Sequence, residues 1–138
     1  MQHDFPSDML ARTSYLSLLA ALFVFSGCSL LGRDTEVRSV PVQQFELVAQ
    51  TSRTVQFDIT GQWRNTCGEF SHFESSLDGT TYSITMYGQQ PDGATCGQAP
   101  TPISGKWSTE IPNAGTYAFQ FQREDSSPLD TSIVFGDK

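Results

Sequence analysis

Strict alternation of apolar and polar side chains, repeated in three separate segments, restricts this chain to a fold built from half-buried β-strands. Two is the side-chain period of a strand, and strands with one apolar and one polar face are typical of antiparallel sheets. The segments are residues 54–60, 81–87 and 116–122, with apolar faces formed by Val55, Phe57 and Ile59, by Tyr82, Ile84 and Met86, and by Tyr117, Phe119 and Phe121. Weaker strand patterns occur at residues 45–49, 69–77, 105–110 and 131–135. Because no helical stripe follows residue 27, the sequence predicts an all-β domain of seven strands.

Turn residues separate the expected strands. The Asp-Gly dipeptide at residues 78–79 is a strong signal for a two-residue hairpin, because both central residues of such a turn adopt positive φ. The segment Pro-Asn-Ala-Gly at residues 112–115 also predicts a turn, since proline presets φ and glycine tolerates the left-handed region. Phe70 and Phe73 lie an odd number of residues apart, so they can share one face of a strand only across a β-bulge.

The segment Ile-Pro-Asn-Ala-Gly-Thr-Tyr at residues 111–117 resembles the tyrosine corner of immunoglobulin-like and fibronectin type III domains. The resemblance implies a seven-stranded antiparallel β-sandwich in which Tyr117 is structural and its hydroxyl donates to a carbonyl of the preceding loop. The strands expected at 54–60 and 116–122 contain no cysteine, so the disulfide that usually joins them in antibody domains is absent.

An uncharged apolar run near the amino terminus indicates export. Residues 15–25 form a run of eleven side chains without a charge, fewer than the roughly 20 apolar residues that a membrane-spanning helix needs. Arg12 supplies a positive flank, so residues 1–27 are typical of a cleaved signal peptide. Either Met1 or Met9 can be the start of this leader.

The apolar run ends in Phe-Ser-Gly-Cys at residues 25–28, which resembles the lipobox of bacterial lipoproteins, with Phe25 where leucine is usual. The resemblance implies cleavage before Cys28 and attachment of acyl chains such as palmitate to that cysteine. It also implies the outer membrane, with the domain facing the periplasm or the cell surface, because Ser29 replaces the aspartate that marks inner-membrane retention in this family. Ordinary secretory cleavage, leaving Cys28 unmodified, is the alternative.

Three parts are therefore expected along the chain: a signal peptide at residues 1–27, a lipidated cysteine and flexible tether at 28–44, and the β-sandwich at 45–138. The tether is inferred because its residues mix charges with glycine and proline and show no sustained period. Sixteen residues of extended chain reach about 50 Å.

The two remaining cysteines are expected to pair with each other. If Cys28 is acylated, Cys67 and Cys96 are left, and such a pair of cysteines is oxidised to a disulfide in the compartments to which proteins are exported. Closing a loop of about 30 residues stabilises a fold by about 3–4 kcal/mol in the chain-entropy account. A metal pair and two free thiols are the alternatives; His72, the one histidine after the leader, offers few partners for a metal site.

The acidic balance and the missing motifs disfavour several function classes. Fifteen Asp and Glu outnumber eight scattered Lys and Arg, giving a net charge of −7, which disfavours nucleic-acid binding. The sequence has no Gly-x-Ser-x-Gly, His-Glu-x-x-His, phosphate-binding glycine loop or Cys-x-x-Cys. We therefore expect no enzyme activity, no cofactor and no metal, and interpret His72 as a surface residue. Glu124, Asp125 and Asp130 are interpreted as a solvated acidic turn rather than a Ca²⁺ site.

The loops at residues 61–68 and 88–102 are expected at one end of the sandwich, held together by the disulfide. Trp63, Arg64 and Asn65 are the candidate binding residues there, because Trp and Arg are enriched at binding hot spots and a stiffened loop loses less entropy on binding. The alternative for Trp63 is a structural role, packing over the disulfide and capping the core.

These features favour a lipid-anchored envelope protein that acts as a non-enzymatic binding module for an envelope protein or polymer. One alternative is a structural or assembly accessory subunit of an outer-membrane complex. A small envelope hydrolase is the third hypothesis, because a pair of carboxylates that meet only in the folded chain is invisible in a sequence.

Overall fold

The computed structural model describes residues 34–123 and 127–137. The expected signal peptide, Cys28, Ser29, Glu124 and Asp125 lie outside the described residues. Within them the chain forms eight strands and no helix: β1 (Thr35–Val40), β2 (Val42–Gln50), β3 (Thr54–Trp63), β4 (Glu69–Asp78), β5 (Thr81–Pro91), β6 (Thr101–Glu110), β7 (Gly115–Phe121) and β8 (Leu129–Phe135). In this part of the chain, accordingly, no helix of membrane-spanning length and hydropathy occurs.

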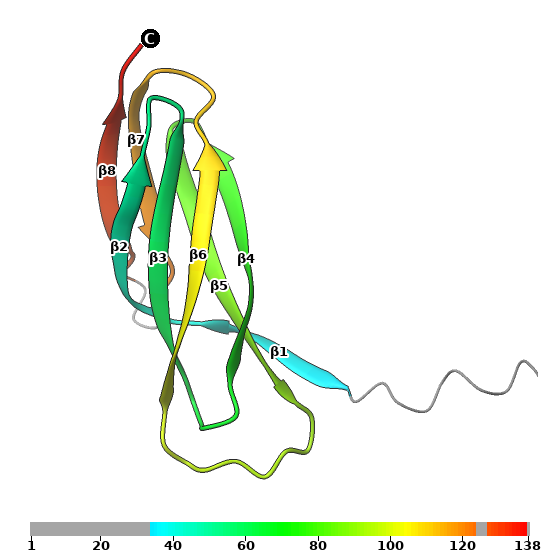
Figure 1. The fold of residues 1–138 in the computed structure, drawn as a ribbon. Coiled ribbons are helices and arrows are strands. Elements are labelled where there is room, and N and C mark those ends of the chain that lie inside the picture. The colour runs from blue at the N-terminus through cyan, green and yellow to red at the C-terminus, as the bar shows by residue number, and fades with distance from the viewer. Residues whose placement is uncertain (1–33, 124–126, 138) are drawn as a thin grey trace, which may run out of the picture. The chain divides into compact units, whose positions relative to one another are not determined.

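The strands form two sheets packed face to face, so the prediction of an all-β sandwich is confirmed (Figure 1). One sheet has the order β2-β3-β6 and is antiparallel throughout. In the other, β5 has β4 along one edge; β7 and β1 each pair with a different part of β5, and β8 pairs with β7. The strands β2, β3 and β6 therefore cover the sheet that contains β5.

The core between the sheets is rich in aromatic rings. The inward faces predicted from the alternation are all buried, and Phe57 and Phe119 are fully enclosed. Phe57 is central, with its ring centroid within 6.2 Å of the rings of Phe45, Trp107, Phe119 and Phe121. Burying large aromatic side chains on both inner faces supplies most of the hydrophobic driving force that joins the two sheets.

The expected tether is the main error in the predicted boundaries. Residues 35–44 form β1 and the start of β2, so the boundary placed at residue 45 falls inside a strand, and the fold has eight strands rather than seven. Little in the sequence indicates β1, because Val37 is exposed while Val40 is buried and the strand also contains the charged residues Glu36 and Arg38. The strand forms because its backbone pairs with β5 over Thr35–Val40.

The pairing of β5 corrects a second expectation. We expected this strand to end at Tyr87 and the sandwich to be antiparallel, but β5 continues to Pro91 and pairs in parallel with β7 over Thr81–Ile84. The extension exists because β1 pairs with Met86–Pro91 on one side of β5 and β4 pairs with Gly88 and Gln89 on the other. The following loop is correspondingly shorter, since β6 begins at Thr101 rather than 105.

Two local predictions are confirmed. A hairpin joins β4 to β5 with Gly79 at φ +58°, although Asp78 still belongs to β4 and the turn residues are 79 and 80. The bulge in β4 lies between Phe70 and His72, and it allows the rings of Phe70 and Phe73 to meet at a centroid distance of 4.8 Å.

The expected tyrosine corner differs in its hydrogen bond. Tyr117 is buried in β7 and its ring packs against Phe135, as a structural role requires. Among the described residues, however, the tyrosine hydroxyl that donates to a carbonyl at this corner is that of Tyr82, which reaches the Glu110 oxygen at 3.4 Å. Tyr82 takes this place because it lies on β5, beside β7, with its ring 6.1 Å from that of Tyr117.

Candidate binding site at the loop end

Two loops and one strand meet at a single end of the sandwich, which we call the loop end. It consists of residues 64–68 between β3 and β4, residues 92–100 between β5 and β6, and the adjacent residues of β1 (Figure 1). Antiparallel pairing of β3 with β6, and of β4 with β5, places both loops at this end.

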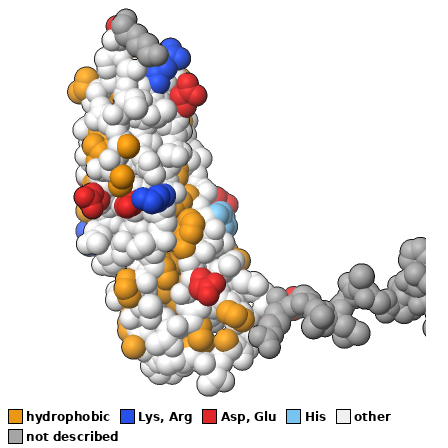
Figure 2. Space-filling view, viewed as in Figure 1, with side chains coloured by type: hydrophobic (Ala, Val, Ile, Leu, Met, Phe, Trp, Pro, Cys, Tyr) orange, Lys and Arg blue, Asp and Glu red, His pale blue; other side chains and the backbone are white. Residues whose placement is uncertain are grey.

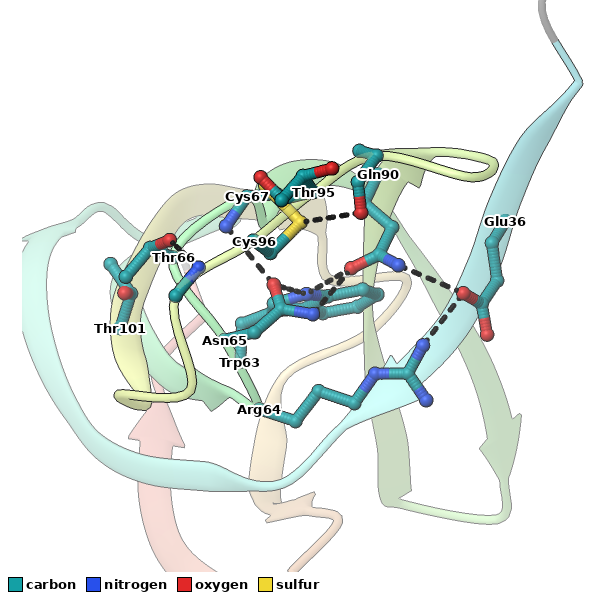
Figure 3. Close-up of a disulfide and its surroundings, with 12 residues drawn as sticks. Glu36, Trp63, Arg64, Asn65, Thr66, Cys67, Gln90, Thr95, Cys96 and Thr101 are labelled. Carbon is teal, nitrogen blue, oxygen red and sulfur yellow. Dashed lines mark hydrogen bonds and ion pairs between the residues drawn. A yellow bond between two sulfur atoms is a disulfide. The ribbon is translucent and has the colours of Figure 1, made fainter.

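The predicted disulfide joins the two loops. Cys67 and Cys96 are bonded, with their Cα atoms 5.6 Å apart, so the alternatives of a metal pair and of two free thiols are wrong (Figure 3). Beside the bridge, the Thr66 amide donates to the Gly97 carbonyl at 3.1 Å, and the Gly97 amide donates to Thr66 Oγ1 at 2.8 Å. The loops are therefore connected by one covalent bond and two hydrogen bonds.

Trp63 is part of the core. Only 3% of its area is exposed, which agrees with the structural alternative, and contact of its side chain with a partner stays a prediction. A Cβ atom on Gly68 would lie 2.0 Å from Trp63 Cγ, and one on Gly88 would lie 2.6 Å from Trp63 Cε3. The indole thus occupies a slot that exists because both neighbouring positions lack side chains.

Asn65 and Gln90 complete the hydrogen bonding around this indole. Trp63 Nε1 donates to Asn65 Oδ1 at 3.1 Å and to Gln90 Oε1 at 3.0 Å (Figure 3). Asn65 Oδ1 also accepts from the Cys67 amide, and Asn65 Nδ2 donates to Gln90 Oε1 at 2.8 Å. Gln90 is 8% exposed, and burying its amide without these partners would be costly. Asn65, one of the predicted binding residues, therefore connects the loop that contains Cys67 to β5.

Glu36 carries the network to the surface. Its Oε2 accepts from Gln90 Nε2 at 3.0 Å and from Arg64 Nη2 at 2.6 Å (Figure 3). Its Oε1 pairs with Arg38 Nε. The side chain of Arg64 is 47% exposed and that of Arg38 is 59% exposed. One carboxylate thus pairs with two exposed guanidinium groups, and of the three predicted binding residues Arg64 is the most exposed.

A groove of about 330 Å³ runs beside these arginines. Its lining includes Arg38, Ser39 and Pro41 on the β1 side and Gln62, Arg64 and Pro100 on the loop side. Of the five Lys and Arg residues that the structure describes, two therefore lie on this groove, although the whole chain has a net charge of −7. The groove is the concave feature of the loop end.

A second polar cluster lies on the outer face of β4 and β5. Ser71 Oγ and His72 Nδ1 are 3.0 Å apart, His72 Nε2 lies 3.9 Å from Glu74 Oε1, and the rings of His72 and Tyr87 stack at 4.7 Å. Tyr87 donates to Glu74 Oε2 at 3.1 Å, and this bond, with smaller contributions from burial and from the negative charge of Glu74, raises the pKa of Tyr87. The His72 and Glu74 side chains are 47% and 66% exposed, so water surrounds the cluster.

Within residues 34–123 and 127–137, no group of three or more His, Cys, Asp or Glu side chains is arranged to hold an ion. Trp107 is buried in the core. Asp130 belongs to β8.

Sequence reasoning missed three residues of the loop-end network: Glu36, Arg38 and Gln90. Both Glu36 and Arg38 fall in the segment interpreted as a tether, and Gln90 falls in the segment interpreted as a loop. A weak signal was available for Gln90, since a buried tryptophan needs an acceptor for its indole N–H. No local pattern selects Gln90 among the other glutamines of the chain.

Comparison with known proteins gives one family match. The model of the ORF11 beta-sandwich domain matches residues 57–129, which is more than half of the chain and extends from the middle of β3 to the first residue of β8. No curated protein and no solved structure matches the chain.

Proposed function

We propose, from the premise that the chain belongs to the ORF11 beta-sandwich domain family, that it is a lipid-anchored binding module of the cell envelope without catalytic activity. The observation that carries the proposal is the loop end. A disulfide and a continuous hydrogen-bond network hold it in shape while Arg38 and Arg64 remain exposed beside a groove. A surface that is already ordered loses little entropy when a partner binds, and arginine is among the residue types most enriched at binding hot spots.

The anchor in this proposal is Cys28, which is acylated, becomes the amino terminus when residues 1–27 are cleaved off, and holds the protein at the outer membrane. The lipobox-like residues 25–28 support it, and the disulfide fits an oxidising compartment. Since β1 begins at Thr35, the segment from Cys28 to Asp34 reaches at most about 20 Å rather than about 50 Å. The shorter tether keeps the loop end, to which β1 belongs, close to the membrane surface.

The absence of catalysis is part of the proposal, and the exposure of the His72 cluster supports it. Ser71, His72 and Glu74 have the residue types of a catalytic triad, but they lie on an open sheet face in water. Catalytic groups of this kind gain most of their effect from donors aligned in a water-excluded site. We interpret the stacking of His72 on Tyr87 as a cross-strand contact that stabilises the β4–β5 pair.

We also infer that the sandwich is a variant of the immunoglobulin-like arrangement. The neighbours β2, β3 and β6 follow the order of strands A, B and E in that fold. The position of β5, which lies with β4, β7 and β8, is where the two arrangements differ.

A second candidate function, assembly into a larger complex, rests on a different surface. Leu47, Val48 and Val134 are exposed, and Gln50 Nε2 donates to the Val134 carbonyl at 3.1 Å, which brings the ends of β2 and β8 together. The outer face of the β2-β3-β6 sheet is mostly uncharged and polar, with hydrophobic side chains in small separate groups (Figure 2). If assembly is the function, a double Val48→Ser and Val134→Ser variant should no longer migrate with a high-molecular-mass complex on native gels. Arg64→Ala should still migrate with that complex.

Affinity capture after crosslinking in native membranes tests the binding module. We expect Arg64→Ala to reduce the captured partner at least tenfold, because it removes an exposed hot-spot side chain. The matched control is Arg53→Ala, which removes another exposed arginine from the turn between β2 and β3 at the opposite end of the sandwich. Equal capture by the two variants would refute the assignment to the loop end.

The lipid anchor has its own test. Cys28→Ser is expected to release the protein from membranes, and retention of the variant in the membrane fraction would refute the lipid anchor.

A further inference from the structure

We propose that the groove beside β1 binds an extended, acidic segment of the partner protein, which pairs with β1 as a further strand on the side away from β5. This inference rests on the proposed function, because it names the chemistry of the partner at the same loop end. The proposed ligand is a peptide strand with a carboxylate side chain that contacts Arg38 and Arg64.

The backbone of β1 supplies the first argument. β1 pairs with β5 along one edge, from Thr35 opposite Pro91 to Val40 opposite Met86. Over residues 36–40, no strand among residues 34–123 and 127–137 pairs with its other edge. In an antiparallel pair, alternate residues direct their N–H and C=O groups away from the partner strand. An edge of this kind is a template for strand addition, and main-chain hydrogen bonds to it give affinity for an extended peptide.

The alternation of β1 supplies the second argument. Glu36, Arg38 and Val40 share one face, with Glu36 bonded to the loop residue Arg64 and Val40 buried. The groove therefore lies between this face of β1 and residues such as Gln62 and Pro100. A strand added to β1 would direct every second side chain into the same space, where a volume of about 330 Å³ accommodates one or two side chains.

Charge selects the chemistry of that side chain. Two guanidinium groups share the single carboxylate of Glu36, so the cluster has one excess positive charge. Each guanidinium has five N–H donors. Among the described residues Glu36 is the ion-pair partner of both Arg38 and Arg64, through one nitrogen of each, so most of their donors are available to a ligand. A carboxylate accepts from such donors in charge-assisted bonds, whereas a lysine or arginine of a peptide would be repelled.

The surrounding network fixes this geometry before a ligand arrives. Glu36 is held by Gln90, Gln90 is held by Trp63 and Asn65, and the disulfide closes the loop that contains Arg64's neighbours. An arginine pair that is already oriented binds a carboxylate with less loss of side-chain entropy.

A randomised heptapeptide library, selected on the purified full chain, tests the proposal. We expect the selected peptides to share an Asp or Glu at one fixed position within an alternating, β-prone sequence. A double Arg38→Gln and Arg64→Gln variant should bind these peptides at least tenfold more weakly, while Arg53→Gln should bind them as the wild type does. Denaturant unfolding of the double variant serves as the folding check, and its midpoint is expected to stay close to that of the wild type because both arginines are exposed.

An N-methyl scan of a selected peptide tests strand addition specifically, because methylation removes one backbone donor at a time. We expect loss of binding at every second position. Selected peptides without an acid, peptides bound equally by the double variant, an N-methyl profile without period two, or a library that yields no ligand would each overturn the inference. If the library fails while crosslinking still captures a partner through Arg64, the binding module stands and the peptide occupant is wrong.

Discussion

The core and the loop end of this domain are both ordered, but different forces order them. In the core, Phe57, Trp107 and Phe119 contact one another and are buried, so removal of apolar area from water holds the sheets together. The loop end is held by the disulfide and by hydrogen bonds among the Trp63 indole, the Asn65 and Gln90 amides and the Glu36 carboxylate. The loop end thus has a fixed shape without an apolar surface of its own.

The difference supports the proposal that the binding surface is at the loop end rather than on the sheets. The apolar side chains that stabilise the core are buried between the two sheets, so a partner cannot contact them. Hydrogen bonds and ion pairs at the loop end leave charged groups such as Arg64 both oriented and exposed. Substitutions in the two regions should therefore separate stability from binding.

The largest expected effect on stability is in the core. Phe57→Ala removes a ring that contacts four others, and we expect it to lower the free energy of unfolding by about 3–5 kcal/mol because of lost burial and a residual cavity. Denaturant titration measures the loss. Val134→Ala, at a side chain that is 69% exposed, is the matched surface control and should change stability by about 0.5 kcal/mol or less. Similar losses for the two variants would contradict the assignment of the core.

Removing the disulfide sharpens the comparison. A double Cys67→Ser and Cys96→Ser variant should lower the free energy of unfolding by up to about 3–4 kcal/mol, because the unfolded chain regains the entropy of an open loop spanning a sequence separation of 29 residues. The near-ultraviolet circular dichroism of the core aromatics should persist. An unchanged stability, with the bridge verified by mass spectrometry in the wild type, would contradict this account.

The network around Trp63 should respond more weakly. Gln90→Ala leaves the indole N–H with Asn65 alone and removes a donor from Glu36, so we expect a loss of about 1–3 kcal/mol in unfolding free energy. Gln44→Ala, at an exposed glutamine of β2, is the control and should be nearly neutral. If the two substitutions have equal effects, the buried network contributes nothing to order at the loop end.

The smallest effect concerns the exposed cluster on β4 and β5, outside both regions. The hydrogen bond from Tyr87 to Glu74 favours the protonated phenol, so the pKa of Tyr87 lies above its usual value. The associated stabilisation is present below the ordinary tyrosine pKa of about 10 and is lost as pH rises through the folded-state pKa. Phenolate absorbance should show Tyr87 titrating at lower pH in Glu74→Gln than in the wild type. An unchanged titration would show that this hydrogen bond is absent in solution.

The core could be predicted from sequence because its signal is local. Every second residue of 54–60, 81–87 and 116–122 faces inward, and the period alone identifies those faces. The bulge near Phe70 was also predictable, since two phenylalanines at an odd spacing require one.

The loop end could be predicted only in part, because most of its contacts join residues far apart in the chain. The pairing of Cys67 with Cys96 followed from counting cysteines. Gln90 is buried because β1 pairs with β5, and no sequence pattern within β1 predicts that pairing. The missed strand therefore concealed Glu36 and Arg38 as well.

Hydrogen exchange at the loop end tests the central claim most directly, which is that this end is ordered before any partner binds. The Thr66 and Gly97 amides, which donate to Gly97 O and Thr66 Oγ1, should be protected in the oxidised chain, with Phe57 in β3 as the core reference. Reduction of the disulfide should accelerate exchange at both loop amides and leave that of Phe57 nearly unchanged. Rapid exchange of Thr66 and Gly97 in the oxidised chain would contradict the account.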